Sequence, residues 1–154
     1  MFANVQMSAS FQTSPDIRRK ATEAFEGAYL RGLWDRLVAA VTGRAHCLRT
    51  LPARLAEGHF AGTRMVPVAR VQGSENRTAD FDADFHPLRQ ESQDRWVSVY
   101  EAMRRGKALP PVELVQVGET YYVRDGHHRL SVARALGMDY VDALVIESAL
   151  RLPR

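Results

Sequence analysis

A run of bulky apolar residues meets a basic helix start at Tyr121-Tyr122-Val123-Arg124-Asp125-Gly126-His127-His128-Arg129. The first four residues are typical of a β-strand, and His127 to Leu136 has the apolar spacing of a helix, with Gly137 as its stop. Backbone N–H groups at a helix start lack intrahelical partners, and the macrodipole adds about half a positive charge there. Gly126 lets a ligand approach the backbone closely. With His127, His128 and Arg129 in the first turn, this junction predicts a phosphate-binding site.

Two other interpretations of the junction stay open. A first helical turn normally favours acidic residues, so three basic side chains there oppose helix stability, a conflict expected at functional sites. In a structural interpretation Asp125 caps the helix, Arg129 pairs with Asp125 or Glu113, and both histidines are solvated. In a metal-binding interpretation the histidines hold zinc, but adjacent helical residues point in different directions, unlike the i, i+4 pairs that share an ion. We therefore assign no metal ligands.

The segments around the junction indicate a small α+β domain with a mixed sheet. Strands are predicted at 65–71, 112–117, 121–124 and 140–147, with a hairpin turn at 118–120. A helix over 92–105 precedes the hairpin. The polar segment 73–90 has too little periodicity for a helix or strand, but Phe81 and Phe85 predict that it is ordered.

Residues 1–64 are predicted to form a helical extension, and residues 65–154 the α+β domain. The first thirteen residues are polar and unpatterned, Ser14-Pro15-Asp16 is typical of a helix start, and Gly43 can end that helix. Apolar residues at near-helical spacing predict one buried face, and they are Ile17, Ala21, Ala24, Ala28, Leu33, Leu37 and Val41. Gly27 and Gly32 each weaken the helix by about 1 kcal/mol relative to alanine, so it needs packing or a partner. A second short helix is predicted over 51–57.

The polar segment carries a cluster of acidic residues. Asp80, Asp82, Asp84 and Glu91 mimic positions 1, 3, 5 and 12 of a calcium loop, but position 6, which requires glycine, is Phe85. A calcium site of that type is therefore not expected. The segment can instead supply a magnesium ligand, a general base or a second phosphate contact through residues such as Glu75, Arg77 and Asp82, or it is simply a solvated acidic loop.

Composition excludes several classes of protein. The chain has 154 residues with 45% hydrophobic and 25% charged side chains, as in an ordinary globular domain, and it has no run apolar enough to cross a membrane. No secretory signal is present at the start, and the lone Cys47 cannot form an internal disulfide, so we expect a cytoplasmic protein. Cys47 is expected to be a small buried hydrophobe, and Trp34 and Trp96 are expected to pack.

Positive charge is concentrated in the N-terminal part of the chain. Residues 1–64 hold nine basic and five acidic side chains, and the rest of the chain has no basic excess. The basic residues of the first helix are Arg18, Arg19, Lys20, Arg31 and Arg36. Such a helix can bind the phosphate backbone of nucleic acid.

Three segments together resemble the ParB/sulfiredoxin superfamily. They are 110–118, beginning Pro-Pro-Val-Glu-Leu, the junction 121–129, and 133–137, Ala-Arg-Ala-Leu-Gly. The resemblance covers about residues 66–147 and implies a small α+β fold, in which many members bind a nucleotide with its phosphates on this helix start. Gly126, His127, His128 and Arg129 match the Gly-Glu-Arg-Arg phosphate motif of the partition proteins, and Arg77 and Phe81 look like their earlier Arg-and-Phe box.

The sequence also departs from members of that superfamily. Sulfiredoxins have cysteine where this chain has His127, so sulfinic-acid reduction is not expected. The partition proteins continue into a helix-turn-helix, whereas this chain stops within ten residues of its last predicted strand, so we do not expect centromere-type DNA reading. Because the superfamily also includes a free-serine kinase and nuclease-like proteins, the resemblance implies the fold better than the reaction.

The leading hypothesis is a ParB-like domain that binds CTP, ATP or GTP with Mg²⁺ and hydrolyses the nucleotide or transfers its phosphoryl group. Gly126 and the following amides would hold phosphate oxygens while His128, Arg129 and Arg77 neutralise their charge. His127 or Asp125 would position water, magnesium or an acceptor hydroxyl, and Glu75 or Asp82 would act as base. The alternatives are a nucleic-acid binder or nuclease that uses the basic helix, and a non-enzymatic interaction module in which that helix pairs with a partner or a second copy.

Overall fold

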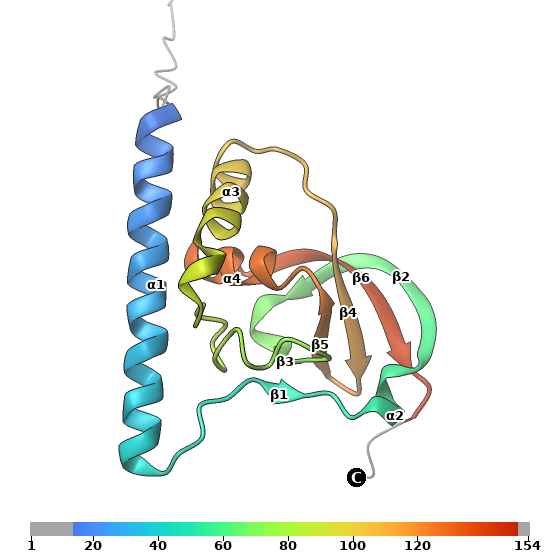
Figure 1. Cartoon of the computed structure of the whole chain (residues 1–154). Helices are drawn as coiled ribbons and strands as arrows, with labels where there is room; N and C mark the ends of the chain where they lie inside the picture. Colours follow the sequence, from blue (N-terminus) through green and yellow to red (C-terminus); the bar gives the residue numbers. More distant parts are fainter. Residues whose placement is uncertain (1–13, 151–154) are drawn as a thin grey trace, which may run out of the picture.

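The computed structural model describes residues 14–150 and has an α+β fold built on one mixed sheet (Figure 1). The polar residues 1–13 lie outside the described part. The strands are β1 (Arg49–Thr50), β2 (Gly58–Pro67), β3 (Val71–Ser74), β4 (Val112–Val117), β5 (Thr120–Asp125) and β6 (Tyr140–Ser148). The α-helices are α1 (Ser14–Thr42), α2 (Ala53–Ala56), α3 (Gln93–Arg104) and α4 (His127–Ala135), with short 3₁₀ turns η1 (Val68–Arg70) and η2 (Gln90–Ser92).

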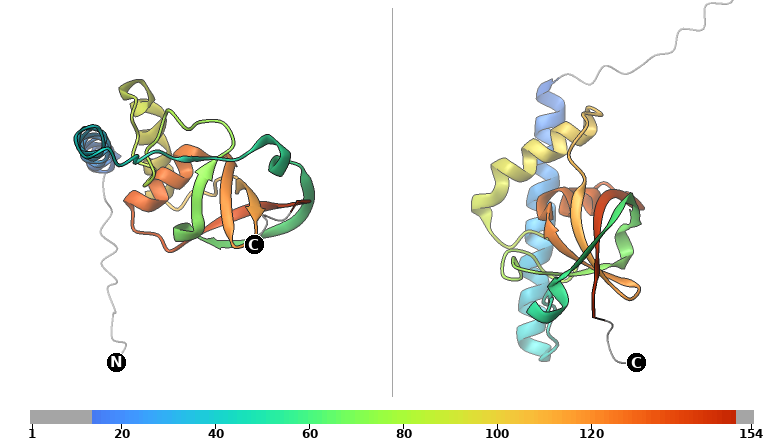
Figure 2. Two further views of the ribbon diagram at one scale, coloured as in Figure 1. Left: turned by 90° about the horizontal axis from the view of Figure 1, so that it is seen from below. Right: turned by 90° about the vertical axis from the view of Figure 1, so that its right-hand side faces the viewer.

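The strands follow the order β1-β3-β5-β4-β6-β2 across the sheet. The central hairpin β4–β5 is antiparallel, whereas β3 runs parallel to β5 and β6 parallel to β4. At one edge β2 pairs antiparallel with β6, and Figure 2 shows these two long strands curving together on the side remote from α1. The parallel neighbours of the hairpin place the carboxyl end of β5 beside the loop that follows β3, and both segments reach the candidate site.

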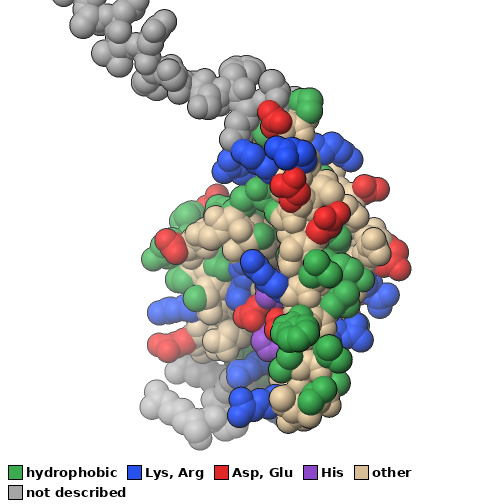
Figure 3. All heavy atoms as spheres, turned by 90° about the vertical axis from the view of Figure 1, so that its left-hand side faces the viewer, with side chains coloured by type: hydrophobic (Ala, Val, Ile, Leu, Met, Phe, Trp, Pro, Cys, Tyr) green, Lys and Arg blue, Asp and Glu red, His purple; other side chains and the backbone are tan. Residues whose placement is uncertain are grey.

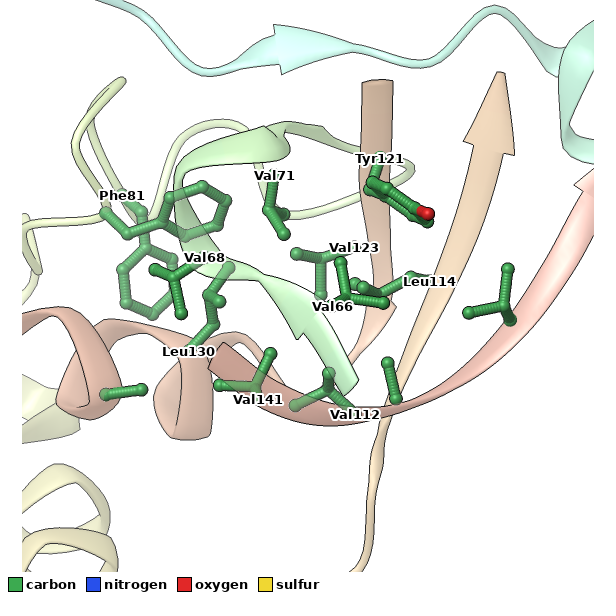
Figure 4. Close-up of a cluster of buried hydrophobic side chains, with 14 of the residues drawn as sticks. Val66, Val68, Val71, Phe81, Val112, Leu114, Tyr121, Val123, Leu130 and Val141 are labelled. Atoms are coloured by element: carbon green, nitrogen blue, oxygen red, sulfur yellow. The ribbon is translucent and has the colours of Figure 1, made fainter. Parts of the chain in front are cut away.

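One core fills the space between the sheet and α4 (Figure 4). Tyr121 and Val123 of β5 point into it, and Tyr122 between them points to the opposite face, as strand alternation requires. The opposite face is covered by Leu51 and by Leu55 of α2. The sheet is therefore buried on both faces near its centre.

A second core joins the helices. Trp96 of α3 is fully buried against Phe25 of α1, with ring centroids 5.7 Å apart, and Val132 of α4 completes the cluster. The indole N–H of Trp96 donates to the Ser131 hydroxyl at 2.9 Å, so its polar atom is satisfied. This packing sets α1 and α4 on either side of α3.

Most elements expected from the sequence are present, and the strand expected at 65–71 is the main exception. That segment is the end of β2, the turn η1 and the start of β3, because the chain turns after Pro67. Residues 58–64 pair with β6, so the division between residues 64 and 65 lies inside β2. The polar segment 73–90 is ordered, as expected, by Phe81 and Phe85, which are each 1% exposed.

The expectation of one buried face along α1 is wrong for the second half of the helix. Ile17, Ala21 and Ala28 are buried, but five residues separate Ala28 from Leu33, a rotation of about 140° beyond a full turn. The later apolar residues therefore point away from the body and form an exposed apolar stripe (Figure 3). We define this outer stripe as Leu30, Leu33, Trp34, Leu37, Val38 and Val41. Trp34 is 63% exposed, contrary to the expectation that it packs, whereas Trp96 does pack.

The two glycines inside α1 differ in their surroundings. A Cβ on Gly32 would lie 2.9 Å from Leu88 Cδ2 and 3.2 Å from the Pro87 carbonyl, whereas a Cβ on Gly27 would meet nothing within 4 Å. Gly32 therefore allows the helix to approach the 86–88 segment closely.

We predict that Gly27→Ala raises the free energy of unfolding by about 0.5–1 kcal/mol, because alanine restricts the unfolded chain. Gly32→Ala should give less stability than Gly27→Ala, since the same gain is opposed by contact with Pro87 and Leu88. Urea denaturation of the two variants measures the difference. Equal stabilisation by both would contradict a close approach at Gly32.

Candidate functional site

The candidate site is a cavity of about 280 Å³ at the junction of β5 and α4. Gly126 caps α4 with φ +99°, and a Cβ there would lie 2.7 Å from Val112 Cγ1, so glycine is required both by conformation and by space. Leu130 N–H makes the first helical bond, to the Gly126 carbonyl, so the amides of residues 127–129 precede the hydrogen-bond ladder. The charged and polar lining residues are Arg77, Arg95, Asp125, His127, His128 and Arg129.

Arg129 is held by the protein itself. Its guanidinium donates to the carbonyl of Pro110, to that of Pro111 at 3.0 Å, and to Asp125 Oδ2 at 3.0 Å. The pairing with Asp125 that the structural interpretation of the sequence required is therefore present. Asp125, with its side chain 67% exposed, stands at the rim of the cavity.

Two further arginines reach the cavity from other segments. Arg77 follows β3, and Arg95 lies in the first turn of α3. Sequence reasoning included Arg77 but missed Arg95, since a helical pattern alone does not show that the first turn of α3 faces the start of α4. The neighbouring Trp96, whose burial sets the rotation of α3, is the signal that could have found it.

Both histidines of the junction are buried against Phe81. The His127 ring stacks on Phe81 with centroids 5.9 Å apart, and the His128 ring meets Phe81 edge to face at 5.4 Å. Their solvation, which the structural interpretation assumed, is therefore absent: His127 is 4% exposed and His128 8%. Phe81 thus orients both imidazoles.

Ser74, at the end of β3, fixes the hydrogen bonding of His127. Its hydroxyl accepts from the amides of Asn76 and Arg77, at 3.2 and 3.1 Å, and lies 2.6 Å from His127 Nε2. The hydroxyl has two acceptors within reach for its own proton, His127 Nε2 at 2.6 Å and the Val123 carbonyl at 3.4 Å. The Nε2 atom of His128, by contrast, is buried and has no hydrogen-bond partner.

Burial lowers the pKa of His127 to about 4, assisted by the positive charge of Arg77 and by that of His128 when His128 is protonated. Burial likewise lowers the pKa of His128 to about 4, with Arg95 and then Arg77 adding to the effect. Both imidazoles are therefore neutral at pH 7, which corrects the expectation that they add positive charge to the cradle. The positive charge around the cavity comes from arginine.

Two of the expected catalytic carboxylates lie elsewhere. Glu75 accepts a 2.7 Å hydrogen bond from Arg124, and neither Glu75 nor Asp82 lines the cavity. Asp82 is 1% exposed and holds His86, whose Nδ1 is 2.9 Å from Asp82 Oδ2, and this hydrogen bond raises the pKa of His86. Asp80 instead accepts a 2.5 Å hydrogen bond from Arg89. Each of these three carboxylates thus has a different basic partner in the structure.

The structure also shows the surroundings of Cys47 and of the basic residues of α1. Cys47 is exposed, which corrects the expectation of a buried hydrophobe. Arg18 lies 3.6 Å from Glu101 and Arg19 lies 3.3 Å from Glu23. Together with Lys20 these arginines point in directions about 100° apart, so the three do not share one side of α1.

Of the comparisons with known proteins, the one with solved structures finds a similar protein. No protein-family model and no curated protein sequence matches the chain. Among solved structures, the sulfiredoxin from Arabidopsis thaliana is similar, with a TM-score of 0.44 and 18% identity over 56% of this chain and 86% of that chain. Within residues 14–150, none of the helices is both long and apolar enough to cross a bilayer.

The low histidine pKa values predict that stability falls with acidity. The unfolded chain takes up protons below pH 6.5, whereas native His127 and His128 stay neutral to about pH 4. The free energy of unfolding should therefore decline between pH 6.5 and pH 4, by up to about 1.4 kcal/mol per pH unit for each histidine.

Replacing His128 by glutamine should flatten this decline in urea denaturation measured at several pH values. His59→Gln is the matched control, because it makes the same substitution at an exposed histidine outside the cavity. A His128→Gln slope equal to that of the wild type would contradict the assignment.

Proposed function

We propose that the cavity at the start of α4 binds the phosphate groups of a nucleotide. The observation that carries the proposal is the convergence of the start of α4 with two arginines, Arg77 and Arg95, on one cavity. Helix-start amides and arginine side chains that meet at one cavity favour an anion.

Each lining residue then has a distinct part. Arg77 and Arg95 neutralise phosphate charge, and the amides after Gly126 hold phosphate oxygens. Arg129, through its bonds to the protein, keeps Asp125 and the 110–111 segment in place. Because about 280 Å³ is at the lower end for ligand pockets, the cavity suits the polyphosphate, with the nucleoside outside it.

Of the carboxylates proposed as catalytic groups, Asp125 is the one at the cavity. If the bound nucleotide, CTP, ATP or GTP, reacts, Asp125 is the group that would orient water, Mg²⁺ or an acceptor hydroxyl. The neutral His127, held by Ser74 at 2.6 Å, would position the first turn of the helix.

The test is a thermal-shift panel with CTP, ATP, GTP and inorganic triphosphate, each with and without Mg²⁺. We expect at least one nucleotide to raise Tm, and Arg77→Ala and Arg95→Ala each to weaken its binding by about tenfold or more, because each removes a charge-assisted contact. Arg105→Ala is the matched control, since Arg105 is exposed at the other end of α3.

The absence of a shift with every nucleotide would overturn the proposal. Binding of duplex DNA that falls steeply with salt and is unchanged in Arg77→Ala and Arg95→Ala would instead favour the basic residues of α1. Triphosphate alone giving the full shift would show that the nucleoside is not recognised.

The outer stripe of α1 favours a second role, pairing with a second copy of the chain. In an antiparallel pair Leu30 faces Val41 of the partner copy, so the stripe is self-complementary. Glu26 precedes the stripe and Arg44 follows it, so the antiparallel arrangement brings opposite charges together at both ends. A parallel pair would oppose like charges.

Light scattering tests this pairing. We expect a dimer for the wild type and a monomer for Trp34→Glu, because the charge would be buried in the interface without a partner. Phe60→Glu is the matched control, since Phe60 on β2 is 62% exposed against 63% for Trp34. A monomeric wild type, or loss of the dimer in Phe60→Glu alone, would contradict a contact through α1.

A further inference from the structure

A cluster of histidine and aspartate side chains lies where α1 meets the segment between β3 and α3, apart from the phosphate cavity. The cluster consists of two groups of three that share Asp35, and within each group the ligand atoms lie within 4.8 Å of one another: Asp35, Asp82 and His86, and Asp35, His46 and Asp84. Figure 3 shows acidic and histidine side chains gathered beside α1. We propose that this cluster binds one divalent transition-metal ion and fastens α1 to the rest of the domain.

The ligand atoms come from three segments far apart in the sequence. Asp35 is on α1, His46 follows that helix, and the other three residues belong to the 82–86 segment. His46 Nε2 lies 3.0 Å from Asp84 Oδ2, 3.9 Å from Asp35 Oδ2 and 3.9 Å from Asp82 Oδ2. His86 Nδ1 lies 2.9 Å from Asp82 Oδ2 and 3.6 Å from Asp35 Oδ2.

These separations are those of ligands around a single ion. Zn²⁺ binds nitrogen and oxygen at about 2.0–2.1 Å, so neighbouring ligands of a tetrahedral ion lie about 3.3 Å apart. The measured separations of 2.9–3.9 Å lie around that value. Asp35 Oδ2, at 3.6 and 3.9 Å from the two imidazoles, is beyond hydrogen-bond distance of either, yet it stands between them.

The Asp82 carboxylate is held in an orientation that suits metal binding. Its side chain is fully buried, and its Oδ1 accepts hydrogen bonds from the amides of Asp84 at 2.9 Å and His86 at 2.8 Å. Those amides occupy Oδ1 and leave Oδ2 directed at the two histidines. A carboxylate fixed by its outer oxygen and presenting the inner one is the usual arrangement of a metal ligand.

The donor set selects the class of ion. Two imidazoles with carboxylates suit Zn²⁺ and other first-row transition ions, whereas Mg²⁺ and Ca²⁺ prefer sites made only of oxygen. The three aspartates carry three negative charges when ionised, and Arg134 lies 3.8 Å from Asp84. A divalent ion therefore also compensates charge that the protein leaves in excess.

Binding there would act on α1. The second half of that helix buries only Gly32 among residues 31–42, so apolar packing does little to hold it. An ion shared by Asp35, His46 and the 82–86 segment would join this half to the body. This proposal does not depend on the phosphate cavity.

The experiment is titration of the full, chelator-treated chain with Zn²⁺ by calorimetry and with Co²⁺ by visible absorption. We expect one ion per chain, tetrahedral or five-coordinate Co²⁺ bands, and a higher Tm with Zn²⁺. Asp35→Asn and His46→Ala, both at partly exposed positions, should each weaken Zn²⁺ binding by tenfold or more while circular dichroism stays native.

His59→Gln is the matched control, because His59 lies 3.8 Å from Glu147 and could itself hold a surface ion. Equal Zn²⁺ affinity in the wild type, Asp35→Asn and His46→Ala would overturn the proposal, as would loss of binding in His59→Gln alone. Failure of the Co²⁺ bands to appear in the wild type would do the same, whatever the variants show.

Discussion

The left-handed turn at Gly126 is the constraint on which the rest of this site depends. Its φ of +99° and its contact with Val112 are both closed to other residues without strain, so β5 passes into α4 with no intervening loop. The helix start is thereby held against the centre of the sheet. From that position His127 and His128 reach Phe81, and Leu130 enters the core beneath the sheet.

At the candidate site the imidazoles are neutral and the guanidinium groups carry the positive charge. His127 and His128 are neutral because the core that orients them also removes water from them, and Arg77 and Arg95 add repulsion. The arginines differ in turn: Arg129 is bonded to Asp125 and two backbone carbonyls, whereas Arg77 keeps a side chain 47% exposed. Arg77 also has a partner in the protein, since its guanidinium lies 3.9 Å from Asp80 Oδ2.

Helix α1 has two different relationships with its surroundings. Its first half packs on Trp96 through Ala21 and Phe25, and its second half approaches the 86–88 segment at Gly32 while presenting an apolar stripe outward. Exposed apolar residues of this density are typical of interaction surfaces. Asp35 of the histidine and aspartate cluster lies on the same half of the helix as the stripe, so an ion bound there would also hold the stripe in place.

The sequence by itself determined the local elements: the hairpin at 118–120, the helix after Gly126, and an order of loop 73–90 that depends on two phenylalanines. Period-2 and period-3.6 patterns and glycine stops involve residues close together in the sequence, so they can be recognised without knowledge of the tertiary structure. Only the tertiary structure decided which residues meet. Arg95 lines the cavity because the burial of Trp96 sets the rotation of α3. Glu75 pairs with Arg124 outside the cavity, and Asp35 reaches His86 across a third of the chain. The five-residue step from Ala28 to Leu33 turns the later apolar residues of α1 away from the rest of the domain. Apolar residues are buried only where another element packs against them, which the sequence pattern does not show.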